Sequence, residues 1–276
     1  MKINKLIIML MALIVFVMPL SGCSVMEDMA VKLNFRNEEF NYIKQNKVDK
    51  IVIQNVRDSG FRFIVNDSQA INDIYKILVK GKKREEKSSL DPDYIFEVYV
   101  GEEKRTYYYV VGESSSKMGN FYNDTSSFSV PKTLENTIMQ NLSFIRKPRN
   151  FEYIYYGSIL KVVRAHKDML ANSKVGIDIS GDVDCLKYVF SADLENFKKN
   201  LDKELNNVDL VNNNSDQFDV IIKIKNRGYN SKTFKTLITI DNKLDKSFNS
   251  YYITAEYNYK DWDIKVSEAN EKPQDW

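Results

Sequence analysis

The strongest constraint on the fold is a set of three long segments near the C-terminus in which apolar and polar residues alternate. They run from Phe218 to Lys225, from Thr233 to Ile240 and from Tyr251 to Tyr259. Successive side chains of a strand point to opposite faces of its sheet, so this alternation predicts strands with one buried face. A polar turn around Gly228 predicts that the first two form an antiparallel hairpin, and Trp262 to Val266 add a fourth strand at the sheet edge.

Helical spacing dominates the residues that precede these strands. A helix from about Tyr153 to Ala171 is predicted because its apolar residues recur at intervals of three and four, and a second helix is predicted to begin with Ser191 as its cap. Two shorter strands are expected between them, at Lys174 to Ile179 and at Leu186 to Phe190. Residues 149–267 are therefore predicted to form a domain in which helices cover one face of an antiparallel sheet, followed by a loose polar tail, residues 268–276.

The first half of the chain indicates the same class of architecture, although the two halves share no internal repeat. Alternating residues predict four strands, at Ile51 to Ile53, Phe61 to Val65, Tyr94 to Val100 and Lys104 to Val111. One helix is predicted after the second strand and another after Pro131. We therefore expect an α+β fold of two modules, 49–148 and 149–267, each an antiparallel sheet with helices on one face.

Part of the first module resembles a known family. The residues that carry the resemblance are, in order, Ile51-Val52-Ile53, Pro92-Asp93-Tyr94, Tyr107-Tyr108-Tyr109, and the stretch from Gly112 through Met118 to Thr125-Ser126-Ser127-Phe128. With this order and spacing, residues about 48–145 resemble the YhfM-like domain of uncharacterised Gram-positive lipoproteins. The resemblance implies a fold and a location at the cell surface, and it implies no catalytic residue.

The N-terminus has the organisation of a bacterial lipoprotein signal peptide. Lys2 and Lys5 precede an uninterrupted apolar run from Leu6 to Met18, which Pro19 ends. This run is shorter than the about 20 apolar residues of a spanning helix. The following Leu20-Ser21-Gly22-Cys23 resembles the lipobox, at which a signal peptide is removed and the cysteine receives its lipid.

We therefore expect residues 1–22 to be a helical signal peptide and Cys23 to be the lipidation site, carrying palmitate and related acyl chains. Two acyl chains hold a protein at a membrane far more firmly than one chain does. Residues 23–48 would then be a tether, and the folded modules would lie on the extracytoplasmic face of the cell membrane. An uncleaved anchor, or a plain secretory signal with a chance cysteine, is the alternative.

Charge and cysteine content limit the functions open to the exported part. The signal peptide holds two of the 40 basic residues and none of the 38 acidic ones, so the remainder is electrically balanced. Nucleic-acid binding normally requires a basic face, so no nucleic-acid partner is expected. If Cys23 carries lipid, Cys185 has no disulfide partner, and it is expected to be a small core residue.

Candidate catalytic and metal-binding residues are few. His166 is the only histidine and lies on an apolar helix stripe, so we expect a partly buried structural residue. Asp178, Asp182 and Asp184 lie close together, but they lack the glycine and the terminal glutamate of an EF-hand calcium loop, and cation binding there is left open. No Cys/His spacing suits zinc and no glycine-rich loop suits phosphate, so neither a metal nor a cofactor is expected.

The abundance of tyrosine indicates binding surfaces instead. Seventeen tyrosines cannot all face inward if the strands alternate, and Tyr107, Tyr109 and Tyr252 are candidate contact residues. Ordinary cross-strand packing is the alternative for each of them. We expect a non-enzymatic envelope lipoprotein that binds a protein, peptide or glycan partner. The alternative is a lipid-anchored hydrolase that uses Asp178, Asp182 and Asp184.

Overall fold

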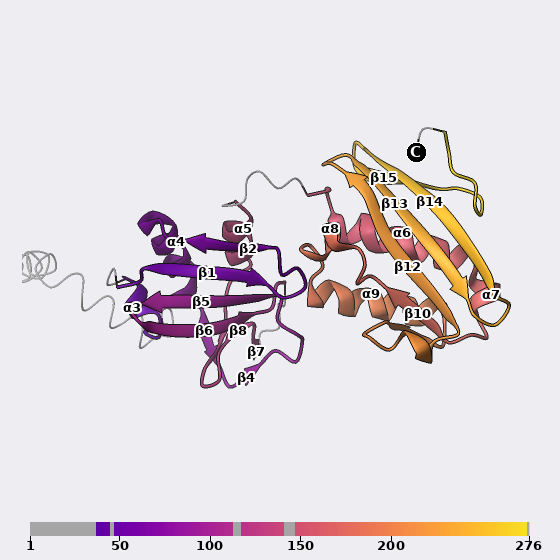
Figure 1. Cartoon of the computed structure of the whole chain (residues 1–276). Coiled ribbons are helices and arrows are strands. Elements are labelled where there is room, and N and C mark those ends of the chain that lie inside the picture. Colours follow the sequence, from indigo (N-terminus) through magenta and orange to yellow (C-terminus); the bar gives the residue numbers. More distant parts are fainter. Residues whose placement is uncertain (1–36, 45–46, 113–116, 141–146, 275) are drawn as a thin grey trace, which may run out of the picture.

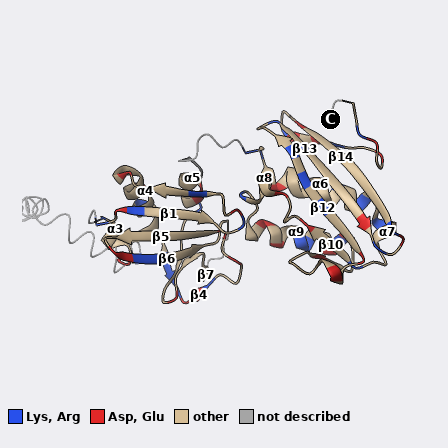
Figure 2. Ribbon diagram, in the orientation of Figure 1, with Lys and Arg blue, Asp and Glu red and all other residues tan. Residues whose placement is uncertain are grey.

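The computed structural model of the chain describes residues 37–44, 47–112, 117–140, 147–274 and 276 (Figure 1). The predicted signal peptide, Cys23 and most of the predicted tether lie outside these residues. The described residues form a first unit, 37–140, and a second unit, 147–276, each with its own sheet and core. This arrangement confirms the predicted α+β class. Acidic and basic residues are interspersed along the ribbon of both units (Figure 2).

The first unit contains a seven-stranded antiparallel sheet of order β2-β1-β5-β6-β8-β9-β3. Its strands are β1 (Lys50–Asn55), β2 (Arg62–Val65), β3 (Lys82–Arg84), β5 (Tyr94–Val100), β6 (Glu103–Tyr109), β8 (Phe121–Tyr122) and β9 (Ser127–Ser129). A separate parallel pair consists of β4 (Glu86–Lys87) and β7 (Met118–Gly119). The helices are α3 (Asn41–Lys44), α4 (Ser68–Leu78) and α5 (Thr133–Gln140), and all three contribute to one core.

The core of this unit begins before the predicted domain boundary. Phe40 and Ile43 are 0% and 3% exposed and pack with the sheet residues, so the predicted tether does not extend to residue 48. The four strands and two helices predicted from periodicity are all present. The short strands β3, β4, β7, β8 and β9 were not predicted, because two or three residues carry too little alternation to recognise.

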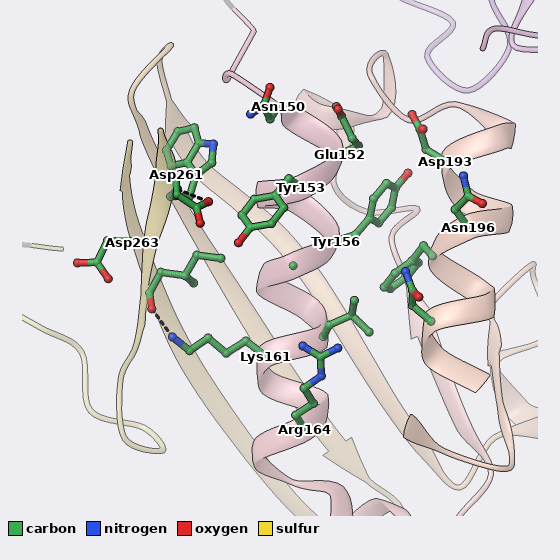
Figure 3. Close-up of a pocket in the computed structure, with 16 residues that line it drawn as sticks. Asn150, Glu152, Tyr153, Tyr156, Lys161, Arg164, Asp193, Asn196, Asp261 and Asp263 are labelled. Carbon is green, nitrogen blue, oxygen red and sulfur yellow. Dashed lines mark hydrogen bonds between the residues drawn. The ribbon is translucent and has the colours of Figure 1, made fainter. Parts of the chain in front are cut away.

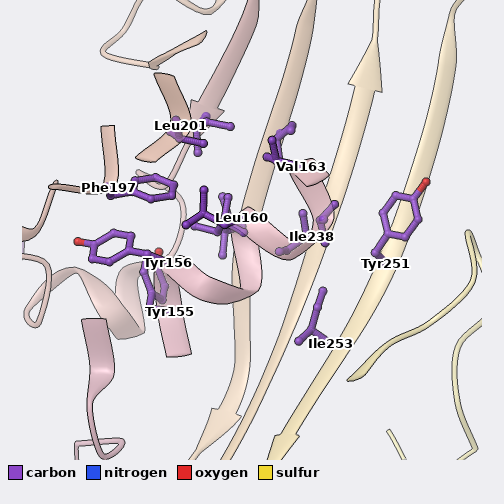
Figure 4. Close-up of a cluster of buried hydrophobic side chains, with 14 of the residues drawn as sticks. Tyr155, Tyr156, Leu160, Val163, Phe197, Leu201, Ile238, Tyr251 and Ile253 are labelled. Atoms are coloured by element: carbon purple, nitrogen blue, oxygen red, sulfur yellow. The ribbon is translucent and has the colours of Figure 1, made fainter. Parts of the chain in front are cut away.

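The second unit contains a six-stranded sheet of order β11-β10-β12-β13-β14-β15. Its strands are β10 (Val175–Asp178), β11 (Val208–Leu210), β12 (Val220–Tyr229), β13 (Thr233–Asn242), β14 (Ser247–Asn258) and β15 (Asp261–Val266). Its helices are α6 (Phe151–Ala165), α7 (Lys167–Leu170), α8 (Val183–Leu186) and α9 (Ser191–Glu204), with a short 3-10 turn, η1 (Ser215–Gln217). Figure 4 shows α6 and α9 packing their apolar side chains against one face of this sheet.

The order of strands in this sheet was only partly predicted. β12 through β15 form antiparallel neighbours, as expected, but β10 pairs in parallel with both β11 and β12. A parallel pair requires a long crossover, and α8 and α9 supply it between β10 and β11. Alternation in a short strand reports burial and not direction, so it could not reveal this pairing.

Two local predictions in this unit are wrong. Residues Leu186 to Phe190 do not form a strand. Leu186 is the last residue of α8 (Val183–Leu186), and the N–H groups of Tyr188 and Val189 donate to the carbonyl oxygens of Cys185 and Leu186, so the segment continues from the helix in tight turns. The helix predicted from Tyr153 to Ala171 is also interrupted, because His166 leaves the helical region with φ of −115° and ends α6.

The two units contact each other through a buried carboxylate. Asp93 in the first unit is 0% exposed, and its Oδ1 accepts hydrogen bonds from Arg57 Nη1 at 2.6 Å and from the backbone N–H of Ser191 at 2.8 Å. Its Oδ2 accepts the N–H of Val111 at 2.7 Å. Because Ser191 begins α9, a carboxylate from the first unit satisfies a free N–H at the start of a helix of the second.

This contact corrects the prediction that Ser191 caps its own helix. Ser191 is the first residue of α9, and the N-cap position belongs to Phe190, which makes no side-chain cap hydrogen bond. The Ser191 hydroxyl donates instead to the carbonyl oxygen of Asp91 at 2.7 Å, and accepts from Arg57. The preceding residue, Phe190, belongs to the core of the first unit, where its ring lies beside that of Tyr94. The units are therefore joined by apolar packing as well as by hydrogen bonds.

Candidate functional site

A groove of about 960 Å³ lies on the second unit, between the edge strand β15 on one side and α9 on the other (Figure 3). Helix α6 forms its floor. Grooves of this size accommodate small ligands or several side chains of a larger one. We treat it as the candidate binding site because it combines open volume with an unpaired strand edge, exposed aromatic surface and acidic groups that form no ion pair with another described residue.

The floor of the groove follows from the spacing of residues along α6. Tyr153, Gly157 and Lys161 recur every four residues, so they share the outward face of the helix. Gly157 keeps the middle of the groove open. A Cβ built on it would meet only the Cδ1 of Ile264, at 3.7 Å, so the glycine is not required by close packing.

One wall of the groove is the free edge of the sheet. β15 has a neighbour only on the β14 side, and the N–H of Ser267, just after β15, donates to β14. Backbone groups of an antiparallel strand bond alternately to either side. The edge residues are Trp262, Ile264 and Val266, whose N–H and C=O groups therefore point away from β14. Lys161 Nζ donates to one of these groups, the carbonyl oxygen of Ile264.

The end of the groove near the start of α6 is acidic. Glu152, Asp193 and Asp261 line it, and none of the three forms an ion pair with another described residue. Partial burial, with the negative charge of Glu152 as a second cause, raises the pKa of Asp193 to about 6. The Glu152 and Asp193 carboxylates therefore repel each other, and a cation at this end would relieve the repulsion.

The opposite end of the groove is basic. Lys161 and Arg164 lie there, and Arg164 Nε donates to the Glu204 carboxylate at 2.7 Å. The groove therefore changes from negative to positive along α6. A ligand with groups of opposite charge could lie in it in only one direction.

Tyr156 lines the wall next to α9 and is 6% exposed. Its ring stacks on Phe197, with the ring centroids 4.7 Å apart. Its hydroxyl is buried and has no hydrogen-bond partner among the described residues. Burial raises the pKa of this hydroxyl well above its usual value, and Figure 3 shows it directed toward the region of Asp193 and Asn196. An unpartnered buried hydroxyl is costly unless something bonds to it.

The predicted tyrosine contacts are wrong for two of three residues. Tyr107 and Tyr109 are 1% and 0% exposed and pack in the first core around Phe121, so neither can contact a partner. Tyr107 and Tyr109 are two residues apart on β6, so both side chains lie on the same face of the sheet, and this face covers the core. Tyr252 is only partly buried, and the ring of Trp276 lies against it at 4.7 Å. The tail is thus held against the sheet, so the prediction of a loose tail is wrong.

The three candidate acids do not share a pocket. Asp182 is 1% exposed and accepts the N–H of Asn226 at 2.8 Å, whereas Asp184 is exposed on α8. Asp178 accepts from the N–H and hydroxyl of Ser180, at 3.0 and 2.6 Å. No group of three possible metal ligands occurs within the residues that the structure describes.

His166 and Cys185 have structural surroundings. The His166 ring lies 4.6 Å from that of Tyr251, and burial lowers its pKa. Cys185 is 0% exposed, and burial together with the neighbouring Asp182 carboxylate raises the pKa of its thiol. The raised pKa of the thiol disfavours a reactive nucleophile at Cys185, and the contact with the Tyr251 ring gives His166 the surroundings of a packed residue.

Comparison with known proteins identifies one family. The model described as YhfM protein matches residues 44–148, which agrees with the resemblance drawn from the sequence. The matched segment makes up most of the first unit and excludes the groove. No curated protein and no solved structure matches the chain. In the described part of the chain, none of the helices is sufficiently long and apolar for a membrane span.

Sequence reasoning missed the groove, although two signals for it are present. Gly157 is a residue with low helix propensity in the middle of a helix, which often indicates a packing or functional requirement. Trp262 begins a strand already predicted to be at the sheet edge. Neither signal shows by itself that the helix and the strand edge lie side by side.

Proposed function

We propose that this protein is a lipid-anchored, non-enzymatic protein of the extracytoplasmic membrane face, and that its second unit binds a partner in the groove between β15 and α9. The observation that carries the binding proposal is the conjunction of that groove with an unpaired strand edge. Partners that are proteins, peptides or wall components all present groups that such a site can bind.

The anchoring proposal is supported by the order of charge, apolar run and cysteine within residues 1–23. The match of residues 44–148 to the YhfM model is compatible with it. We expect Cys23→Ala to abolish incorporation of radiolabelled palmitate and to leave precursor or released protein. The matched control is Cys185→Ala, which removes a buried thiol and should leave labelling unchanged. Persistent labelling of the Cys23→Ala chain would contradict lipidation at this residue.

The binding proposal is tested by crosslinking in the intact envelope. Tyr153 is 50% exposed within the groove, and Phe248 is 60% exposed outside it, so a photoreactive phenylalanine analogue can replace either with little structural change. We expect position 153 to give a discrete adduct that position 248 does not give. If both positions give the same products, or neither gives any, the groove is not the binding site.

The alternative hydrolase that uses Asp178, Asp182 and Asp184 is less well supported. Such a mechanism needs carboxylates that converge on one substrate. Asp182 is instead buried against Asn226, and Asp184 is exposed on α8. The arrangement of the three acids thus favours a structural role.

A further inference from the structure

We propose that the groove binds an extended peptide that pairs with β15 as an additional strand and places one lysine or arginine side chain among Glu152, Asp193 and Asp261. This inference rests on the proposed function, because it takes the groove to be the binding site. It adds the chemical class of the ligand, its backbone pairing with β15 and the position of its charge.

The backbone of β15 supplies the first argument. The edge groups of Trp262, Ile264 and Val266 form a row of donors and acceptors repeated every second residue, which is the pattern that another strand matches. This row spans five residues, or about 17 Å of extended chain. Two groups of this row already have side-chain partners. The Trp262 N–H donates to Asp261 Oδ1 at 2.8 Å, and the carbonyl oxygen of Ile264 accepts from Lys161 Nζ, so an incoming backbone must replace both side chains.

The shape of the groove supplies the second argument. A strand added beside β15 would direct alternate side chains toward α6, onto the open position at Gly157 and the apolar surface of Leu160 and Phe197. A flat sheet edge without such a floor would accept any strand. The floor instead favours small or medium apolar side chains at alternate positions of the peptide.

Charge supplies the third argument. At the acidic end, Glu152, Asp193 and Asp261 have no ion-pair partner in the described part of the chain, and the unpartnered Tyr156 hydroxyl adds a hydrogen-bonding group on the same side. A lysine ammonium or an arginine guanidinium would offset part of the negative charge of the carboxylates and can donate to a hydroxyl oxygen. At the other end, Lys161 and Arg164 repel such a group, so only one position of the peptide suits it.

Gly157 provides a matched pair of variants. Gly157→Phe fills the middle of the groove, while Gly157→Ala adds a single methyl group that the structure accommodates, 3.7 Å from Ile264 Cδ1. Both replacements remove a glycine from a helix interior and are expected to preserve or raise stability. A loss of binding that is specific to Gly157→Phe therefore reports occupancy of the groove and not unfolding.

The probes are seven-residue peptides of alternating valine and threonine, with a single lysine moved through each position, and they are measured against the full-length chain in detergent. We expect one lysine position to bind at least about 5-fold more tightly than the others, in line with partly exposed ion pairs. Gly157→Phe should weaken that peptide at least about 10-fold, and Gly157→Ala less than about 2-fold. The double variant Glu152→Gln, Asp193→Asn should remove the lysine preference.

Backbone methylation tests the pairing itself. Methyl groups on the alternate peptide nitrogens that face β15 should abolish binding, whereas methyl groups on the intervening nitrogens should not. Equal effects of the two methylation patterns, or equal binding to Gly157→Phe and the parent chain, would overturn the proposal.

A glycan probe distinguishes this inference from the proposed function. If an N-acetylglucosamine oligomer, and none of the peptides, binds in a manner that Gly157→Phe abolishes, the peptide inference is wrong while the groove remains a binding site. If neither probe binds and position 153 gives no specific crosslink in the envelope, the proposed function fails together with the inference.

Discussion

The carboxylate of Asp93 is expected to be the most sensitive single group at the contact between the two units. It accepts three hydrogen bonds, from Arg57, Val111 and Ser191, and water does not reach it. Asp93→Asn keeps the shape of the side chain but replaces one acceptor oxygen with an NH2 group. In one orientation the NH2 group faces the N–H of Val111, and in the other it faces the donors of Ser191 and Arg57. In either case two buried donors face each other and neither has an acceptor.

The size of the stability loss follows from the groups that Asp93→Asn leaves without a partner, namely a buried N–H donor and the Arg57 charge. A buried donor left without an acceptor costs about 1 to 3 kcal/mol. Removing one partner of a buried ion pair costs about 3 to 5 kcal/mol, and the Arg57 side chain is 17% exposed, so water can compensate part of its charge. We therefore expect Asp93→Asn to lower the free energy of unfolding by about 3 kcal/mol.

The measurement is urea unfolding followed by tryptophan fluorescence, because Trp262 lies in the second unit with its Nε1 donating to the carbonyl oxygen of Arg149. Asp91→Asn is the control. The Asp91 side chain is exposed and lies two residues away, so its replacement should change the free energy by no more than about 0.5 kcal/mol.

A double-mutant cycle decides whether the effect comes from the pair. Arg57→Met combined with Asp93→Asn should reveal a coupling of about 2 kcal/mol, since the two groups share a hydrogen bond of 2.6 Å. A loss below about 1 kcal/mol for Asp93→Asn, or a coupling near zero, would refute the view that this ion pair supports the contact with Ser191 of the second unit.

Two further predictions concern buried or crowded groups of the second unit. Because the folded state raises the pKa of Asp193 to about 6, its ionisation removes stability as pH rises from about 4 to above 6. In urea unfolding, the free energy of unfolding of Asp193→Asn should therefore equal that of the parent at pH 4 and exceed it by about 1 kcal/mol at pH 7. This value allows for solvent screening and for the favourable position of a negative charge at the start of α9. Equal differences at both pH values would contradict the prediction. The buried thiol of Cys185 should react with a thiol reagent only as fast as the protein opens, which a Cys23→Ala chain can show because it contains no other cysteine; rapid reaction in the native state would contradict the burial.

Sequence periodicity was sufficient for the larger strands and helices, because each has enough residues for a repeat of two or of 3.6 to be visible. It was insufficient where the partner lies far along the chain. The N–H of Ser191 is satisfied by a carboxylate 98 residues earlier in the sequence, so a local capping rule assigned the wrong role to its hydroxyl. Similarly, the inward direction of Tyr107 depends on which face of β6 the helices cover.

The same reasoning explains why the groove escaped prediction while its parts did not. Gly157 belongs to a helix and Ile264 to an edge strand, and both elements were predicted. Their side-by-side placement, 3.7 Å between a Cβ at position 157 and the Ile264 side chain, depends on how α6 crosses the sheet. A residue larger than alanine at this position would leave the predicted elements unchanged and still close the groove. The binding that we propose for this unit therefore depends on a property that alternation and helical spacing do not encode, namely the space left between correctly predicted elements.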